Sequence, residues 1–223
     1  MQADQRGLAA GVDQLRQQRG HPAAVRKVKR TVRLVQQKQR RILGNRARQN
    51  TELQITPFPL THRVPCCGYA LALPRAGKFD PARARAAGIP IEYWGTLQKG
   101  ETVGGFTPEQ VLGAPRRGLK VVYATDSRPC PAIVDAARDA DLLCMDATYA
   151  DDADLDKAKL YGHATCRETG ETAAAAQVRR LWLTHYSAAV SDTAPGLAAA
   201  RAACPAAVAG YDGLTEKLEF DKT

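Results

Sequence analysis

The chain has 223 residues, of which 44% are hydrophobic and 25% charged, a composition that supports a globular core. No run of about eighteen uncharged apolar residues occurs, and the N-terminus lacks the apolar segment of a secretory signal. We therefore expect neither a membrane-spanning nor an exported protein, and we place it in the cytoplasm.

The net charge of +9 comes entirely from the N-terminal segment. Residues 1–50 hold 13 Lys and Arg against 2 Asp and Glu, together with nine Gln and no aromatic residue. This basic segment, predicted to be disordered or helical, buries too little to fold alone. Three interpretations stay open: an arm that contacts RNA phosphates, an organelle presequence, or a stretch foreign to the natural protein. The third arises if the coding region is truncated or misread, and the absence of a histidine-rich metal motif favours it.

Six cysteines lie mostly in apolar segments without a C-x-x-C pair, which favours reduced thiols over disulfides or a cysteine zinc site. From residue 52 onward the pattern becomes regular: 52–56 and 69–73 read as strands. A Gly- and Pro-rich excursion, about 74–118, follows with two short helices. Asp80 caps the first, which begins at Pro81 and ends at Gly88, and Thr107, Pro108 and Gly113 play the same parts in the second.

Strands and helices then alternate. We predict strands at 119–125, 142–147, 179–184 and 214–220, and helices at 131–138, after Thr165, and at 195–203. Thr165 with Glu168 three residues later is a capping box. Such alternation predicts a layered α/β domain with its site at the strand ends.

One acidic side chain and three imidazoles stand at or near the ends of these elements: Asp126, His62, His163 and His185. Each alone is more often a turn former or a structural residue. Together they are the donor set that zinc prefers.

The flanking motifs make residues 52–223 resemble the C-terminal portion of the ribonuclease Z family. These are phosphodiesterases of the metallo-β-lactamase type that remove the 3′ trailer from precursor tRNA. The matching stretches, in order, are PLTHRVPCCGY, PRAGKFDPARARAAGIP, GLKVVYATDSRP, DLLCMDATY, GHAT and LWLTHYS. The resemblance implies an αββα sandwich whose N-terminal half is missing, with 51–223 as a partial domain.

The resemblance also implies roles for individual residues. His62 and His185 would each bind one of two zinc ions, and Asp126 would bridge them. His163 would assist the leaving group and Asp146 would orient it, although the family more usually has a glutamate there. The excursion resembles the arm that clamps tRNA, with phosphate contacts from five basic residues: Arg75, Lys78, Arg83, Arg85 and Lys99.

One departure is severe. The family's principal metal motif, His-x-His-x-Asp-His, occurs nowhere in this sequence, and His21 is the only histidine in residues 1–50. We therefore expect the chain to bind at most one zinc ion, weakly, and not to cleave RNA. A non-catalytic RNA-binding or interaction protein with the same fold is the alternative. The family also implies a homodimer.

Overall fold

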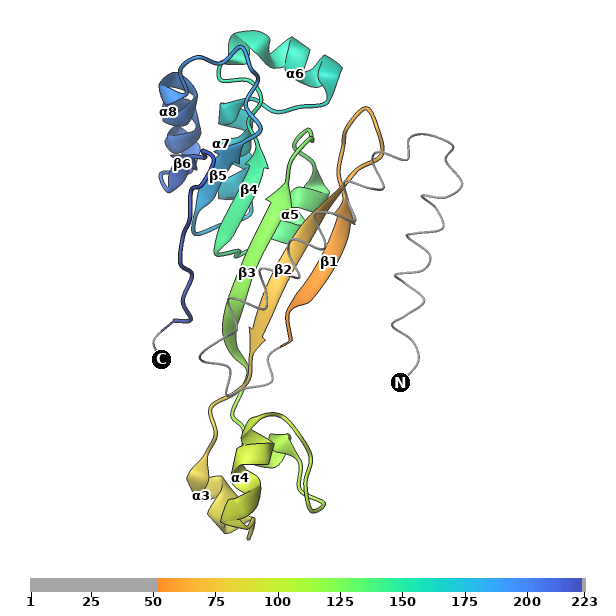
Figure 1. Cartoon of the computed structure of the whole chain (residues 1–223), viewed down its shortest axis with the longest axis vertical. Helices are drawn as coiled ribbons and strands as arrows, with labels where there is room; N and C mark the ends of the chain where they lie inside the picture. The colour runs from red at the N-terminus through yellow and green to blue at the C-terminus, as the bar shows by residue number, and fades with distance from the viewer. Residues whose placement is uncertain (1–51, 222–223) are drawn as a thin grey trace. The chain divides into compact units, whose positions relative to one another are not determined.

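A six-stranded mixed sheet organises residues 52–221, the part of the chain that the computed structural model describes (Figure 1). The strands follow one another in chain order across the sheet: β1 (Gln54–Pro59), β2 (Cys67–Arg75), β3 (Arg116–Ala124), β4 (Leu142–Asp146), β5 (Leu181–Thr184) and β6 (Ala207–Ala209). The first three pair antiparallel, and β3 to β6 run parallel. The α/β prediction is confirmed. The predictions for residues 1–50 lie outside the described range.

The parallel arrangement decides where the site residues meet. Because β3, β4 and β5 run in the same direction, the residues at their carboxyl ends share one edge of the sheet. Strand β2 runs the opposite way, so the segment that leads into its start reaches the same edge. Asp126, Asp146, His185 and His62 follow, end or precede these four strands.

The core lies on one face of the sheet. Alternate strand residues such as Val122, Leu143, Met145 and Leu181 are fully buried against three helices. These are α5 (Pro131–Ala137), α7 (Cys166–Ala175) and α8 (Ala194–Ala203). The strands on this face are β-branched or leucine-rich and the helices are alanine-rich, a pairing that lets the two layers approach closely. The described residues thus form one sheet with one helical layer.

The excursion between β2 and β3 has a small core of its own. Helices α3 (Pro81–Ala86) and α4 (Ile91–Gln98) and a short 3₁₀ turn, η1 (Pro108–Gln110), enclose buried Ala84, Leu97 and Val111. We call residues 76–115 the arm. Asp80 accepts hydrogen bonds from the N–H groups of Ala82 and Arg83, as its predicted capping role requires. The arm joins the far ends of β2 and β3, away from the edge that carries the site residues (Figure 1).

Three expectations were wrong or incomplete. Residues 214–220 form no strand, and the last strand is β6, whose three residues are too few for an alternating pattern to reveal. Helices α4 and α6 (Leu155–Tyr161) were not predicted, because α4 contains Gly95 and α6 begins in an acidic run that reads as a loop. The second arm helix is only the 3₁₀ turn, although its Thr107 and Gln110 form a capping box. None of the described helices combines the length and apolar character that crossing a membrane requires.

Candidate metal centre

Two of the candidate ligands occupy a strained backbone conformation. Asp126 has φ of 58° and His185 has φ of 63°, in the left-handed region that non-glycine residues rarely adopt. Each residue follows a buried parallel strand, so the turn projects its side chain over the sheet edge. Aspartate and histidine tolerate this region better than β-branched residues do, and such strain is often found at functional sites.

Asp146 organises the centre from below. Its side chain is fully buried and accepts five hydrogen bonds. The donors are the backbone N–H groups of Ser127, Thr148 and Ala164, the Thr148 hydroxyl at 2.7 Å and Nδ1 of His163 at 2.8 Å. One carboxylate therefore ties together the loops after β3 and β4 and the loop before α7. The predicted contact between Asp146 and His163 is present, and the shorter aspartate side chain reaches it.

The hydrogen bonds of Asp146 fix the tautomers of two histidines. A carboxylate cannot donate, so Nδ1 of His163 carries the proton and its Nε2 is left with a lone pair. The Thr148 hydroxyl lies 2.7 Å from the Asp146 carboxylate and 3.1 Å from the His185 carbonyl, and both of these oxygens can only accept its single proton. When it donates to either one, its oxygen accepts from Nδ1 of His185, which lies 3.0 Å away.

This tautomer brings two electron-rich atoms together. Nε2 of a neutral His185 would present a lone pair to Oδ1 of Asp126, only 2.8 Å away. Two acceptors at that distance repel each other unless a positive charge lies between or beside them. Either a proton on His185 or a bound cation supplies that charge.

His62 completes the cluster from the loop between β1 and β2. Its Nε2 is buried without a hydrogen-bond partner among the described residues, and its Nδ1 accepts a long, 3.4 Å bond from the Val64 N–H. Burial, followed by the nearby charge of His163, lowers the pKa of His62, so the ring is neutral at pH 7. A metal ion would satisfy the orphaned nitrogen, provided that the ring proton moves to Nδ1 and the contact with Val64 is given up.

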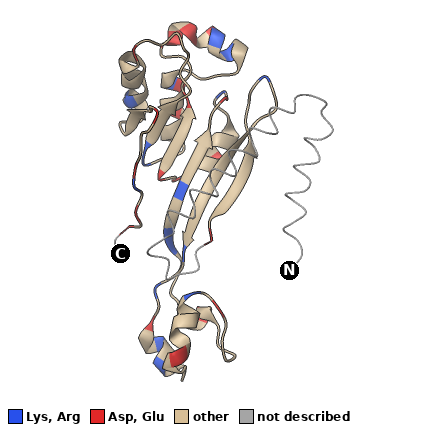
Figure 2. Cartoon of the chain, in the orientation of Figure 1, with Lys and Arg blue, Asp and Glu red and all other residues tan. Residues whose placement is uncertain are grey.

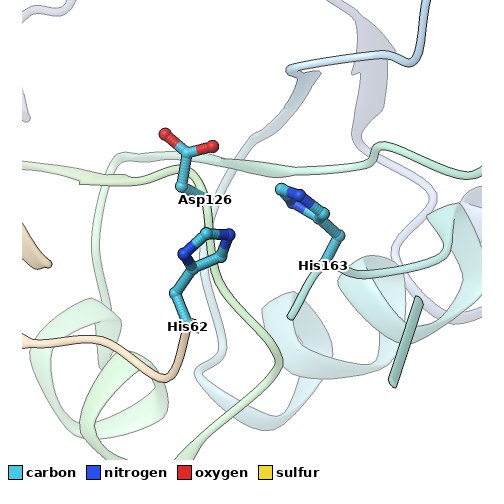
Figure 3. Close-up of side chains that lie close together, drawn as sticks. All are labelled: His62, Asp126 and His163. Atoms are coloured by element: carbon cyan, nitrogen blue, oxygen red, sulfur yellow. The ribbon is translucent and has the colours of Figure 1, made fainter. Parts of the chain in front are cut away.

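The donor atoms are close enough to share an ion. Those of His62, Asp126 and His163 lie within 4.8 Å of one another (Figure 3). Those of Asp146, His163 and His185 form a second such group. The ring centroids of His163 lie 5.0 Å from His62 and 5.2 Å from His185. The five predicted site residues are therefore one cluster of imidazole and carboxylate donors, which fits zinc. In the structure, His163 is the histidine whose donor atoms lie near those of both His62 and Asp126. The sequence had instead predicted His185 as the third ligand beside His62 and Asp126.

Sequence reasoning missed two residues that support the cluster. Thr148 links Asp146 to His185, as described above. Arg128 donates 2.6 and 2.7 Å hydrogen bonds to the carbonyl of His163 and to Glu168, and forms a largely buried ion pair with that glutamate. Each lies two residues after a predicted site residue, in the TDSRP and MDAT motifs, and that closeness in sequence is the signal the sequence offers for them.

Gly162 holds the loops of His163 and His62 in close contact. It ends α6 with φ of 83°, and a Cβ atom there would lie 3.0 Å from Cδ2 of His62 and 3.1 Å from the Arg63 nitrogen. We expect Gly162→Ala to lower the free energy of unfolding by about 1–2 kcal/mol, because the left-handed backbone and the crowding both penalise alanine. Gly100→Ala is the matched control: its φ is 87°, but no atom lies within 4 Å of the added Cβ. Urea denaturation of both variants checks this. An equal loss in the two would contradict the crowding.

The predicted RNA-binding residues of the arm differ in what they contact. Arg83 donates to the carbonyls of Glu109 and Leu112, and Arg85 lies 5.5 Å from the centre of the Trp94 ring. These two side chains stabilise the arm itself. Lys78 and Lys99 are exposed. Arg75 is described below.

Comparisons with known proteins show what the chain is similar to. The model of the beta-lactamase superfamily domain matches residues 7–186. The ribonuclease Z of Lachnospira eligens is 42% identical over 172 residues, which are 75% of this chain and 57% of that protein. The ribonuclease Z of Halobacterium salinarum is 37% identical over 185 residues, 79% and 60% of the two chains. A solved metallo-beta-lactamase fold protein from Bacillus subtilis matches 70% of this chain and 46% of its own, with 20% identity and a TM-score of 0.43. The chain spans somewhat more than half the length of its curated relatives.

Proposed function

The chain belongs to the beta-lactamase superfamily, and on that premise we propose that it carries part of a zinc-dependent endoribonuclease that removes the 3′ trailer from precursor tRNA. One observation carries the proposal: His62, Asp126, His163 and His185 converge around the buried carboxylate of Asp146. The relatives are named ribonuclease Z, which supports RNA cleavage, and the precursor-tRNA substrate is what the resemblance to that family implies.

His62, Asp126 and His185 would hold zinc. Two imidazoles and a carboxylate are a usual zinc ligand set, and the orphaned Nε2 of His62 supports it. When bound, zinc supplies a hydroxide near neutral pH and neutralises charge on the phosphate oxygens.

His163 has the geometry of a general acid. Asp146 fixes its ring through Nδ1, so that Nε2 is free to hold a proton for the departing ribose oxygen. Because Asp146 is itself held by four other donors, the orientation of this proton is set before substrate binds.

The sequence as it stands lacks the His-x-His-x-Asp-His motif that completes the site in the family. We therefore propose that this chain binds at most one zinc ion, weakly, and does not cleave RNA unassisted. Zinc content after dialysis, together with cleavage of a labelled precursor tRNA, tests this. Efficient cleavage by the purified chain would overturn the proposed inactivity. Zinc content above one ion per chain would overturn the proposed weak, incomplete site, and failure to bind tRNA would overturn the function as a whole.

The arm supports a homodimer and an RNA partner. Strand β2 spans eight residue steps from the site edge to the arm, or roughly 26 Å at about 3.3 Å per residue. An arm so far from its own metal cluster can serve a long RNA or the site of a second subunit. We propose both, and a precursor-tRNA substrate would place the chain in the cytoplasm. Light scattering of the purified chain tests the dimer.

A further inference from the structure

A second polar site lies at the foot of the arm, where β2 ends and β3 begins. A pocket of about 300 Å³ is lined there by four cations and one carboxylate: Arg75, Lys78, Arg116, Arg117 and Asp221. Arg75 and Arg116 face each other in the antiparallel register, and Figure 2 shows the basic segments at the start of β3. We call this the foot pocket.

Acidic side chains neutralise only part of the foot pocket. Asp221 accepts two hydrogen bonds from Arg179, at 2.8 and 3.0 Å, and lies 3.8 Å from Arg117. Asp141 binds Arg117 at 2.7 Å. Counting Arg179 with the lining, five cations share two carboxylates. The surplus of three positive charges would attract an anion.

The surplus charge belongs to identifiable side chains. Within residues 52–221, no carboxylate lies within ion-pair distance of Arg75, Lys78 or Arg116. Arg116 uses its Nε to donate to the Ala76 carbonyl, and Arg75 donates to the Asp221 carbonyl while lying over the Phe220 ring. These contacts hold both guanidinium groups in place, and each group has further N–H donors that could bind a ligand. The carbonyl of Lys78 accepts a 2.9 Å hydrogen bond from the Gly113 N–H, whereas its ammonium group makes no hydrogen bond with another described residue.

We propose that the foot pocket binds a phosphate group of the RNA backbone. Planar guanidinium groups held by backbone carbonyls present paired N–H donors that match phosphate oxygens, and a mobile lysine adds a point charge. The distance of roughly 26 Å from the metal cluster suits a second contact on an RNA whose end lies at that cluster. The inference rests on the proposed RNA substrate and adds Arg116 and Arg117 to the residues that contact it.

The test compares two double variants that remove the same charge. Lys78→Gln/Arg116→Gln removes two lining cations, and Arg138→Gln/Lys217→Gln removes two exposed cations outside the pocket. Binding of mature tRNA is measured in chelator, so that no zinc is required, across a range of salt concentrations. We expect the pocket variant to bind on the order of tenfold more weakly at low salt, with a shallower salt dependence by about one phosphate contact. The control should change less than about twofold.

Two further measurements, on the single variant Lys78→Gln and with inorganic phosphate as a second ligand, complete the test of the foot pocket. Lys78→Gln alone removes no described contact and should still weaken binding by about threefold. Inorganic phosphate is then titrated into the same proteins. Equal tRNA affinity of the two double variants would overturn the foot pocket and leave the proposed function standing. Phosphate binding that is lost in the pocket variant, with tRNA affinity unchanged, would also overturn it, because the pocket would then serve free phosphate. A wild-type chain that binds no tRNA would remove the RNA partner together with the pocket.

Discussion

Replacing Asp146 by alanine should lower the free energy of unfolding by about 3–5 kcal/mol, because it leaves three buried backbone N–H groups and His163 without their acceptor. Chemical denaturation measures the effect. The side chain is fully buried, and its partners come from the loops after β3 and β4 and the loop before α7. Its loss should therefore also disorder the cluster of histidines.

Asp135→Ala is the control for this prediction. Its side chain is 73% exposed and pairs only with Arg138 one helical turn away, so the loss should stay below about 0.5 kcal/mol. A change of less than 1 kcal/mol for Asp146→Ala would mean that water replaces the carboxylate. Asp146 would then no longer be the scaffold of the site.

Asp126→Asn should weaken zinc binding by at least about 100-fold and leave the fold intact. Mutating a residue that only hydrogen-bonds a metal ligand typically costs about 10–100-fold in metal affinity. Asp126 is itself a proposed ligand, so its loss should cost at least as much. Asparagine tolerates the φ of 58° found here, and the side chain is about half exposed, so stability should hardly change. Zinc affinity is measured by competition with a chromophoric chelator, and stability by thermal unfolding.

Asp139→Asn provides a matched control for the charge and for the backbone. It too has a left-handed φ, 55°, and an exposed side chain, but it lies at the opposite edge of the sheet, before β4. Zinc affinity should be unchanged in this variant. Equal losses in the two variants would show that net charge alone, and no direct ligand at position 126, governs zinc binding.

The sequence predicted the parts of the fold in which one local pattern dominates. Runs such as Val121–Ala124 and Leu142–Met145 are β-branched or apolar throughout, as buried parallel strands are, and the capping box of Thr165 marked the start of α7. The superfamily match confirms the predicted fold class and the resemblance to ribonuclease Z. Strand β6 escaped prediction because its three residues form a strand only through pairing with β5.

The site was predictable as a set of residues but not as a network. Strand ends located Asp126 and His185, because parallel strands bring their carboxyl ends together, whereas Asp146 was identified only through the resemblance to the family. The link from Asp146 through Thr148 to His185 depends on long-range packing and has no sequence pattern of its own. The foot pocket likewise needs Asp221, which is more than a hundred residues from Arg75, to be seen as a site.

X-ray absorption at the zinc edge of the purified, zinc-loaded chain identifies the atoms that bind the metal. We expect a first shell of nitrogen and oxygen atoms at about 2.0–2.1 Å, with imidazole scattering that diminishes in His62→Ala and His185→Ala. Cys66, whose thiol donates to the Asp126 carbonyl, offers the competing sulfur donor. A sulfur shell at about 2.3 Å, or imidazole scattering unchanged in both variants, would contradict a zinc site built from His62, Asp126 and His185.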